Sequence, residues 1–341
     1  MIAGRHPADF QPLPGFANRH LQTLLPRILP RPALSLVDEI LELPDGDFVE
    51  LTWLDAPTLS AEAPVLVLFH GLEGSVDSPY ARHLLRAAER RGWRAVLMHF
   101  RGCGKWPNRL PRAYHSGDTA DARRLLERLA RHYPSAPRVA LGVSLGANML
   151  LKLVAEDADN ALGLTGAIAV APPVNLAACA DTLERGTARL YQRHLLGALK
   201  AKVAPRLARR ELPLALSHGD LGRCTTLRAY DDAITAPLHG FNDAADYYQR
   251  AAAAPLLGDI HLPTLILHAE DDPFMPPGLY DGLTLGPGIR LEIARHGGHV
   301  GYVEWRNGHP TSWLARRVER QLDEWSERAT VSLPAFSQSG N

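Results

Sequence analysis

Short apolar runs alternate with amphipathic segments through much of the chain. The apolar runs fill residues 63–70, 94–100, 138–143, 166–172, 263–270 and 289–295. Between the first four runs, residues 80–92, 118–133 and 146–158 carry apolar side chains at helical spacing. Apolar strands that alternate with such helices predict an α/β fold, in which helices cover both faces of a mostly parallel sheet.

Two further strands are predicted near the start of the chain. Residues 35–43 and 48–54 read as an antiparallel pair, because the sequence PDGD between them is a turn signal. With this pair the pattern predicts about eight strands. The segment 1–33, which is rich in Pro and Arg, is expected to form an arm that wraps over the surface.

The regular alternation breaks between residues 174 and 236. This segment reads as several helices with irregular joins, and the chain returns to a strand only at Pro263. We therefore predict an inserted helical cap. The expected organisation is a core from 1–173, the cap at 174–236, a second part of the core at 237–330 and a tail at 331–341.

The predicted cap is basic and contains one apolar stripe. From Glu184 to Arg228 it carries ten Arg or Lys residues against three acidic ones. The stripe has helical spacing and consists of Leu195, Leu199, Val203 and Leu207. The simplest interpretation is a cap helix that packs on its own domain and turns a solvated basic face outward. The alternative is a surface that attracts anionic substrates or lipid headgroups.

Composition and charge narrow the class of protein. The 37 basic and 37 acidic side chains cancel, which argues against a nucleic-acid partner. Cys103, Cys179 and Cys224 are too few and too far apart for a disulfide framework, as expected in a reducing compartment. The first residues lack the apolar region of a secretory signal, and no apolar run approaches the roughly 18 residues of a membrane span. These features predict a cytoplasmic protein.

The sequence RVALGVSLGANML, residues 138–150, places a serine between two glycines where a strand gives way to a helix. Gly142, Ser144 and Gly146 form the Gly-x-Ser-x-Gly pattern of a nucleophile elbow. Small residues must flank such a sharp turn, which exposes the serine hydroxyl above the sheet. The alternative is a serine that caps a helix after an ordinary turn.

A serine nucleophile needs a base and a third group that orients the base. In this type of fold the acid and then the histidine follow the serine, each after a strand. Asp272 and His299 occupy these places, and the register Ala269-x-x-Asp-x-x-x-Pro276 favours Asp272 over Asp271.

His296 shares the loop of His299 but is nearer the strand end, and a structural role is expected for it. A His-x-x-His metal site is the other reading, but no third ligand is evident nearby. The sequence therefore predicts a Ser144–Asp272–His299 triad without a metal.

An oxyanion hole requires two backbone amides near the serine. One is expected from Leu145, directly after the nucleophile, and the other from the loop FHGLEGS after the strand 63–70. His70 and Gly71 end that strand, so the amide of Leu72 is the natural second donor. Losing one such donor typically costs about 3 kcal/mol of transition-state stabilisation. The alternative for this loop is a plain turn.

Beyond these patterns, the chain resembles the YheT-like family of α/β-hydrolases. NRHLQTLLP at 18–26, FRGCG with NRLPRAYHSGDTAD within 100–121, and YDDAITAPLHGFNDAADYY at 230–248 look like family elements. The loops DDPFMP and GGHVGY match the acid and histidine loops of the family. The resemblance implies an α/β-hydrolase fold, the triad and a hydrolase or esterase activity, but it does not specify a substrate.

The long loop at 100–121 supplies further candidates. Tyr114 and His115, together with His70 and Gly71, are candidate substrate-binding residues. Ser116 or Asp118 is expected to cap the helix that follows, by accepting hydrogen bonds from its free amides. Many members of the family have Ser or Cys where this sequence has alanines at 251 and 252, so a polar contact there is lost.

The predicted reaction is hydrolysis of a carboxylic ester with a short to medium acyl chain. It proceeds through an acyl-enzyme and requires no cofactor. The expected partner is a small-molecule ester or lipid, with weak membrane contact through the basic cap; no particular oligomeric state is indicated.

Three alternatives stay open: an alcohol acyltransferase, a membrane-associated lipase and a non-catalytic binding protein. No histidine has an aspartate five residues later, which weighs against the His-x-x-x-x-Asp type of acyltransferase.

Overall fold

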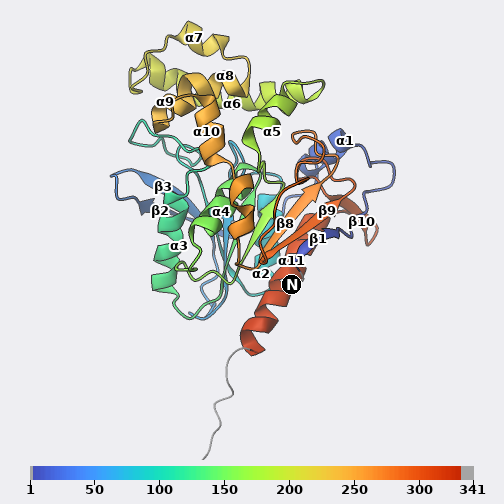
Figure 1. Ribbon diagram of the computed structural model, residues 1–341. Helices are drawn as coiled ribbons and strands as arrows, with labels where there is room; N and C mark the ends of the chain where they lie inside the picture. The colour runs from blue at the N-terminus through green and yellow to red at the C-terminus, as the bar shows by residue number, and fades with distance from the viewer. Residues whose placement is uncertain (1–2, 332–341) are drawn as a thin grey trace, which may run out of the picture.

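A twisted sheet of nine strands forms the centre of the molecule (Figure 1). The computed structural model describes residues 3–331. The order of the strands is β1-β9-β8-β7-β6-β4-β5-β3-β2. Their bounds are β1 (Gly4–Pro7), β2 (Leu36–Glu42), β3 (Phe48–Leu54), β4 (Val65–Phe69), β5 (Arg94–Met98), β6 (Arg138–Val143), β7 (Gly166–Val170), β8 (Thr264–Ala269) and β9 (Ile289–Ala294).

The strands are parallel from β5 through to β1, and β3 and β2 are antiparallel at the other edge. All five residues of β4 are buried, as expected for a strand at the centre of a sheet with both faces covered. Leu66 and Leu68 point to one face and Val67 and Phe69 to the other. The prediction of a mostly parallel α/β sheet is therefore confirmed.

Helices cover both faces of this sheet. Helices α3 (Ala120–His132) and α4 (Leu145–Glu156) pack on the face that carries Val67, where Leu125 and Leu150 join the core. Helices α2 (Ala81–Glu89) and α11 (Trp313–Val331) pack on the other face, where Leu84 and Leu322 contact the sheet residues. Each helix buries its apolar side, which accounts for the helical spacing in the sequence.

The N-terminal segment contributes more to the sheet than the sequence suggested. Residues Gly4–Pro7 form β1, a ninth strand that pairs in parallel with β9. Only a surface arm was expected here. Four residues that end in proline give no strand signal, and proline is tolerated because the strand lies at the sheet edge. The same segment continues into α1 (Arg19–Leu24) and a short 3₁₀ turn, η1 (Leu25–Arg27).

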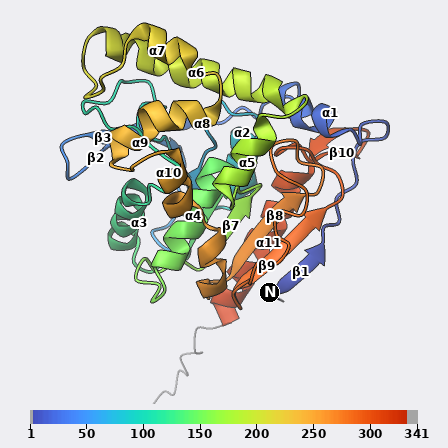
Figure 2. The same cartoon turned by 45° about the horizontal axis from the view of Figure 1, so that its top comes forward.

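The chain between β7 and β8 forms a helical layer above the carboxyl ends of the strands (Figures 1 and 2). Its elements are α5 (Leu176–Leu183), α6 (Ala188–Ala208), α7 (His218–Arg223), α8 (Leu227–Tyr230), the π-helical turn η2 (Asp231–Thr235), α9 (Ala236–His239) and α10 (Ala244–Ala251). The 3₁₀ turn η3 (Ala254–Asp259) then packs beside α4, where Leu257 joins the core of the sheet. Leu199, Val203 and Leu207 of the apolar stripe pack with Leu196 and Tyr230 in a small core of this layer. These three residues of the stripe therefore help to pack the layer on itself.

A two-stranded hairpin of β10 (Val303–Arg306) and β11 (His309–Ser312) precedes α11. Apart from Val331, which ends α11, the tail predicted at 331–341 lies outside the described residues. Within residues 3–331, the helices are all too short or too polar to cross a bilayer.

Candidate active site

Ser144 lies at the sharp turn between β6 and α4. Its backbone has φ 53° and ψ −118°, in a region that side-chain-bearing residues seldom occupy and that is frequent at functional sites. A Cβ atom on Gly142 would lie 2.4 Å from the carbonyl oxygen of Gly146, and one on Gly146 would lie 2.5 Å from that of His70. Only glycine fits at these two positions, so the turn depends on both.

The hydroxyl of Ser144 lies within hydrogen-bond reach of a histidine. Ser144 Oγ is 3.0 Å from Nε2 of His299, and Nδ1 of His299 is 2.8 Å from Oδ2 of Asp272. A carboxylate beside Nδ1 favours a proton on that nitrogen, which leaves Nε2 free to accept the hydrogen of the serine. The structure thus brings together three residues that are far apart in the sequence.

The two adjacent carboxylates of the acid loop point in different directions. Asp272 is buried; its Oδ1 accepts a hydrogen bond of 2.8 Å from the amide of Phe274, and its Oδ2 faces His299. Asp271 accepts a hydrogen bond of 2.9 Å from the amide of Gly298, and burial raises the pKa of its carboxyl. His296 lies beside Asp271, with 3.6 Å between Nδ1 and Oδ2. Asp271 and His296 therefore contact each other and the loop, away from Ser144.

His299 is held by residues that the sequence analysis did not single out. Its amide donates a 2.9 Å hydrogen bond to Oγ1 of Thr23, and its ring stacks on Phe274 with 4.0 Å between centroids. The buried side chain of Gln22 accepts a hydrogen bond from the amide of Val303, just after the histidine loop. Gln22 and Thr23 belong to the family element NRHLQTLLP. The resemblance drew attention to this element but did not indicate that it supports the histidine loop.

Leu72 and Leu145 line the same cavity as Ser144. Neither amide has a hydrogen-bond partner among the described residues, and Leu145 is the first residue of α4, where amides lack partners within the helix. A Cβ atom on Gly71 would lie 3.3 Å from Cβ of Ser144. The strand end that carries Leu72 is therefore directly beside the serine, and the amide of Gly71 donates to the hydroxyl of Tyr80 at 2.8 Å.

His70 does not reach the cavity, so it cannot contact a substrate there. It is fully buried and is not among the residues that line the cavity. Its Nε2 accepts a hydrogen bond from the amide of Phe100, and its Nδ1 donates to the carbonyl of Gly71 at 2.7 Å. Burial lowers the pKa of His70 to about 3, so the ring stays neutral and suits this pair of contacts. His70 ties the loop after β4 to the loop after β5.

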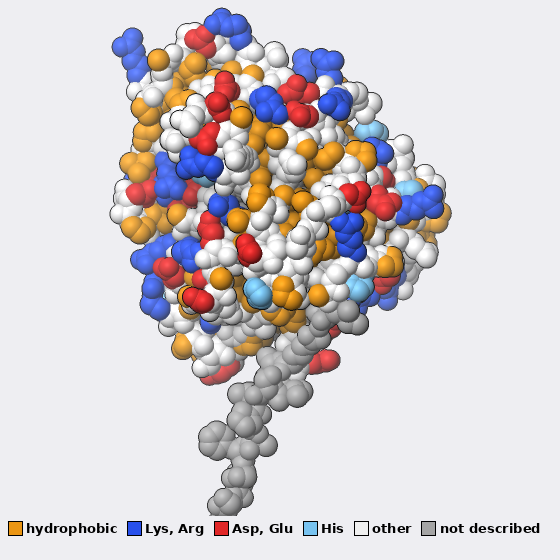
Figure 3. All heavy atoms as spheres, viewed as in Figure 1, with side chains coloured by type: hydrophobic (Ala, Val, Ile, Leu, Met, Phe, Trp, Pro, Cys, Tyr) orange, Lys and Arg blue, Asp and Glu red, His pale blue; other side chains and the backbone are white. Residues whose placement is uncertain are grey.

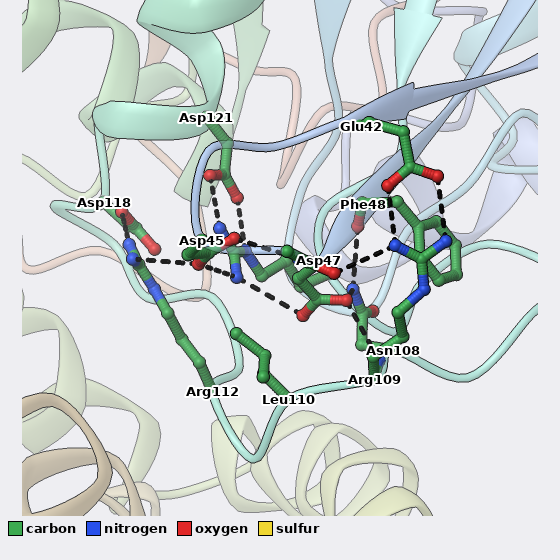
Figure 4. A network of polar contacts seen from close by, with 12 residues as sticks. Glu42, Asp45, Asp47, Phe48, Asn108, Arg109, Leu110, Arg112, Asp118 and Asp121 are labelled. Atoms are coloured by element: carbon green, nitrogen blue, oxygen red, sulfur yellow. Dashed lines mark hydrogen bonds and ion pairs between the residues drawn. The ribbon is translucent and has the colours of Figure 1, made fainter.

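A buried arginine anchors the long loop that follows β5. Two nitrogens of Arg101 bind the two oxygens of Asp121 at 2.7 and 2.8 Å, and a third contacts Asp45 at 2.7 Å. Burial alone would lower the pKa of Arg101, but the carboxylates of Asp121 and Asp45 raise it above its ordinary value. Asp47 binds Asn108 and the amide of Arg109 farther along the loop, and Figure 4 shows the loop held against the β2–β3 turn by these contacts.

The anchored loop carries Tyr114 and His115 to the cavity wall. The Tyr114 hydroxyl donates to Oε1 of Glu73 and accepts from its amide, both at 2.8 Å. His115 packs edge-on against His239, and burial lowers the pKa of His115 to about 3 and that of His239 to about 4. Both rings are therefore neutral parts of the wall.

The expected helix cap in this loop is wrong. Thr119 is the N-cap residue of α3, and no side-chain hydrogen bond caps the helix. The carboxylate of Asp118 instead accepts a 2.6 Å hydrogen bond from Arg112, and the amide of Ser116 donates to the hydroxyl of Tyr247. Asp118 faces an arginine of its own loop, and this ion pair takes the place of the cap.

A cavity of about 1130 Å³ lies between the helical layer and the carboxyl ends of the strands. Ser144 and His299 border it, and much of its wall consists of apolar side chains from several elements. These include Leu176, Leu183, Leu195, Leu199, Phe274 and Met275. Helix α6 closes one side and is linked to the loop after β4 by an ion pair between Lys202 and Glu73.

Comparison with known proteins decides the family. The model of the α/β hydrolase fold family matches residues 64–304. The chain belongs to the α/β-hydrolase family. Within this family it is a YheT-like hydrolase, because it is 45% identical over 94% of both chains to the Escherichia coli (strain K12) protein named "Putative esterase YheT".

More distant relatives agree on the fold. The chain is 27% identical to a human protein named "Phospholipase ABHD3", over 83% of this chain and 71% of the relative. Among solved structures, the α/β hydrolase GrgF from Penicillium sp. sh18 superposes with a TM-score of 0.55 at 17% identity, over 87% of this chain and 100% of that one. In residues 3–331, His, Cys, Asp and Glu side chains do not gather in any group of three or more that could hold a metal ion.

Proposed function

We propose that this hydrolase cleaves carboxylic esters through Ser144, His299 and Asp272. The observation that carries the proposal is the continuous chain of contacts from Ser144 Oγ to His299 at 3.0 Å and from His299 to Asp272 at 2.8 Å. A serine hydroxyl becomes a useful nucleophile only when a base can take its proton, and the base works only when it is held in the right tautomer.

In the proposed reaction, His299 accepts the proton of Ser144 as Oγ attacks the ester carbonyl. The negative charge that develops on the carbonyl oxygen is stabilised by the free amides of Leu72 and Leu145. His299 then protonates the departing alcohol, which leaves an acyl group on Ser144. A water molecule repeats the sequence, releases the acid and restores the serine. Asp272 orients the imidazole and stabilises its charged form.

The apolar cavity supports an ester substrate, for which we propose a short to medium acyl chain. Its volume of about 1130 Å³ exceeds that of many ligand sites, and its apolar wall favours hydrocarbon over charged groups. A lipid ester is the second candidate class, and the names of two relatives favour it: the human phospholipase and a Saccharomyces cerevisiae protein named "Monoacylglycerol lipase", 27% identical over 81% of this chain.

Among the candidate binding residues, Gly71 and His115 are proposed to contact the substrate, because both border the cavity. For Tyr114 we propose a positioning role, because its hydroxyl is engaged by Glu73. We also retain 174–236 as the proposed cap, between core parts at 1–173 and 237–330. Its helices supply the side of the cavity opposite Ser144.

The proposal is tested with an active-site probe and a substrate series. A fluorophosphonate probe should label the wild-type protein and fail to label Ser144→Ala. Hydrolysis of p-nitrophenyl esters from acetate to palmitate should then give a chain-length optimum, which measures the acyl site. If the folded wild-type protein is neither labelled nor active, the esterase proposal fails and the chain is better explained as a binding protein.

A further inference from the structure

Two segments that are distant in the sequence meet beside the cavity. Helix α1 and the first turn of α6 are connected through His20, whose Nδ1 is 3.1 Å from the hydroxyl of Tyr191 and whose Nε2 is 3.1 Å from Oγ1 of Thr187. The rings of His20 and Tyr191 stack with 5.8 Å between their centroids. Figures 1 and 2 both show α1 next to the end of α6 at the border of the helical layer.

These segments expose large apolar side chains. Leu21 is 42% exposed, Leu24 48%, Ile28 77% and Leu190 71%. They make up half of the eight large apolar side chains that are exposed in residues 3–331, although the two segments are short. We call Leu21, Leu24, Ile28 and Leu190 the apolar patch. Because Leu24 and Leu190 also line the cavity, the patch adjoins the cavity that contains Ser144.

The two segments that carry the apolar patch are basic. The sequence from Phe10 to Val37 contains three arginines and no acidic residue, and the sequence from Arg185 to Arg210 contains eight Arg or Lys residues and no acidic one. Arg189 and Arg193 are four residues apart in the first turns of α6, so they share one side of that helix, and Arg185 lies in the turn just before it. All three are exposed, and none has an ion-pair partner in the part of the chain that the structure describes.

Basic side chains are also prominent on the helical layer elsewhere, at the top of the molecule in Figure 3. At the apolar patch the two features coincide. Exposed apolar side chains and unpaired arginines together match the boundary of an anionic bilayer, where acyl chains lie just below phosphate groups. A second copy of this chain fits less well, because two such basic surfaces would repel one another.

We infer that the apolar patch and the arginines at 185, 189 and 193 dock the protein on an anionic lipid surface. The patch would enter the boundary between headgroups and acyl chains, and the arginines would contact the lipid phosphates. Docking in this orientation brings the cavity to the membrane, so a lipid ester could reach Ser144 without crossing water. Only this last consequence rests on the proposed esterase function; the docking itself does not.

Flotation of the full chain with vesicles tests the inference. The protein should float with phosphatidylcholine vesicles that contain phosphatidylglycerol, bind pure phosphatidylcholine more weakly, and lose binding as salt is raised. Arg189→Gln with Arg193→Gln should lower the partition constant at least about tenfold, because each basic residue contributes roughly fivefold near such a surface. Leu21→Asp with Ile28→Asp should lower it at least as much.

Matched control variants test whether the loss of vesicle binding is specific to this surface. Ile40→Asp removes an equally exposed apolar residue, 47% exposed, from β2 at the opposite edge of the sheet. Arg124→Gln with Arg131→Gln removes two charges from α3. Neither control should change flotation by more than about twofold. All of these variants should hydrolyse a water-soluble p-nitrophenyl ester as the wild type does, which shows that they fold.

Three outcomes would overturn the inference. The first is a wild-type protein that stays unbound on anionic vesicles. The second is an equal loss of binding in the control variants. The third is a concentration-dependent dimer that Leu21→Asp with Ile28→Asp abolishes, since the patch would then join two copies of the chain. Ser144→Ala should still float, so a failure of docking and a failure of the proposed esterase function are distinguished.

Discussion

The Nζ atom of Lys202 lies 2.8 Å from Oε2 of Glu73, so an ion pair joins α6 to the loop after β4. Glu73 directly follows Leu72, one of the two proposed oxyanion donors, and has a φ of 54°. Its side chain is nearly buried and also accepts a hydrogen bond from Tyr114. The position of the Leu72 amide is therefore coupled to a helix of the layer above the cavity.

Replacing Lys202 should weaken transition-state stabilisation more than substrate binding. In Lys202→Met, Glu73 loses its cationic partner in a nearly buried place, and the loop that carries Leu72 becomes less ordered. We expect kcat on a soluble ester to fall about tenfold while KM changes by less than about threefold, since a misplaced oxyanion donor acts mainly on the transition state.

Lys200→Met is the matched control for this prediction. Lys200 lies one half-turn earlier on α6 and donates to the carbonyl of Gly222, away from the loop after β4. Steady-state kinetics of both variants decide the question. A kcat for Lys202→Met equal to that of Lys200→Met would show that the ion pair serves only to pack the helix.

Replacing Asp272 should lower kcat far more than replacing Asp271. Asp272→Asn keeps the shape of the buried side chain but favours the wrong tautomer of His299, so we expect kcat to fall about 10⁴-fold. Asp271→Asn retains an oxygen for the Gly298 amide and should lower kcat by less than about tenfold. The comparison is made on one ester at saturating concentration. A larger loss in Asp271→Asn would reassign the acid of the triad.

The local parts of this architecture could be predicted from the sequence. Buried parallel strands and amphipathic helices have distinct spacing, so β4 to β9 and helices α2 to α4 followed from the pattern. The elbow at Ser144 was predictable because the Gly-x-Ser-x-Gly pattern is local, although the contacts that require Gly146 are with Phe69 and His70 at the end of β4. The strand ends then placed Asp272 and His299 near it, since parallel strands end at one edge of a sheet.

Long-range contacts were not predictable in the same way. Thr23 meets His299 across 276 residues, and Phe274 stacks on that ring only because two loops converge. His70 was placed correctly at a strand end, but its burial depends on the loop after β5. Strand β1 was missed because a short edge strand depends on its partner β9 more than on its own residues.

Gly146→Ala should destabilise the protein because the elbow has no room for a methyl group. The added Cβ would lie 2.5 Å from the His70 carbonyl oxygen and 2.6 Å from that of Phe69, and backbone atoms cannot rotate away. We expect the free energy of unfolding to fall by about 3 kcal/mol, as for severe overpacking. Urea denaturation, followed by circular dichroism, measures this change.

A second glycine provides the control for this prediction. Gly197 lies within α6, and a Cβ atom there would meet nothing within 4 Å. Gly197→Ala should therefore stabilise the helix by about 0.5–1 kcal/mol, since alanine has the higher helix propensity. If Gly146→Ala were as stable as Gly197→Ala, the close packing of the elbow against β4 would be refuted.

Asp231 should make the stability of the protein depend on pH. Thr235 donates to its Oδ1 and Tyr248 to its Oδ2, both at 2.7 Å, yet burial raises the pKa of Asp231 to about 6 from an ordinary value of 3.8. The folded state therefore binds a proton more tightly than the unfolded state. The resulting stability is fully present below about pH 4 and is lost as the pH rises through about 6.

Asp231→Asn removes this dependence. Relative to the variant, the wild type should lose about 2 kcal/mol of unfolding free energy between pH 4 and pH 7, since each unit of pKa difference is worth about 1.4 kcal/mol. Urea denaturation of both proteins across this range gives the difference. The neighbouring exposed Asp232, changed to asparagine, should follow the wild-type curve. A difference between wild type and Asp231→Asn that stays constant with pH would contradict the assignment, because only a group that titrates within the range can change it.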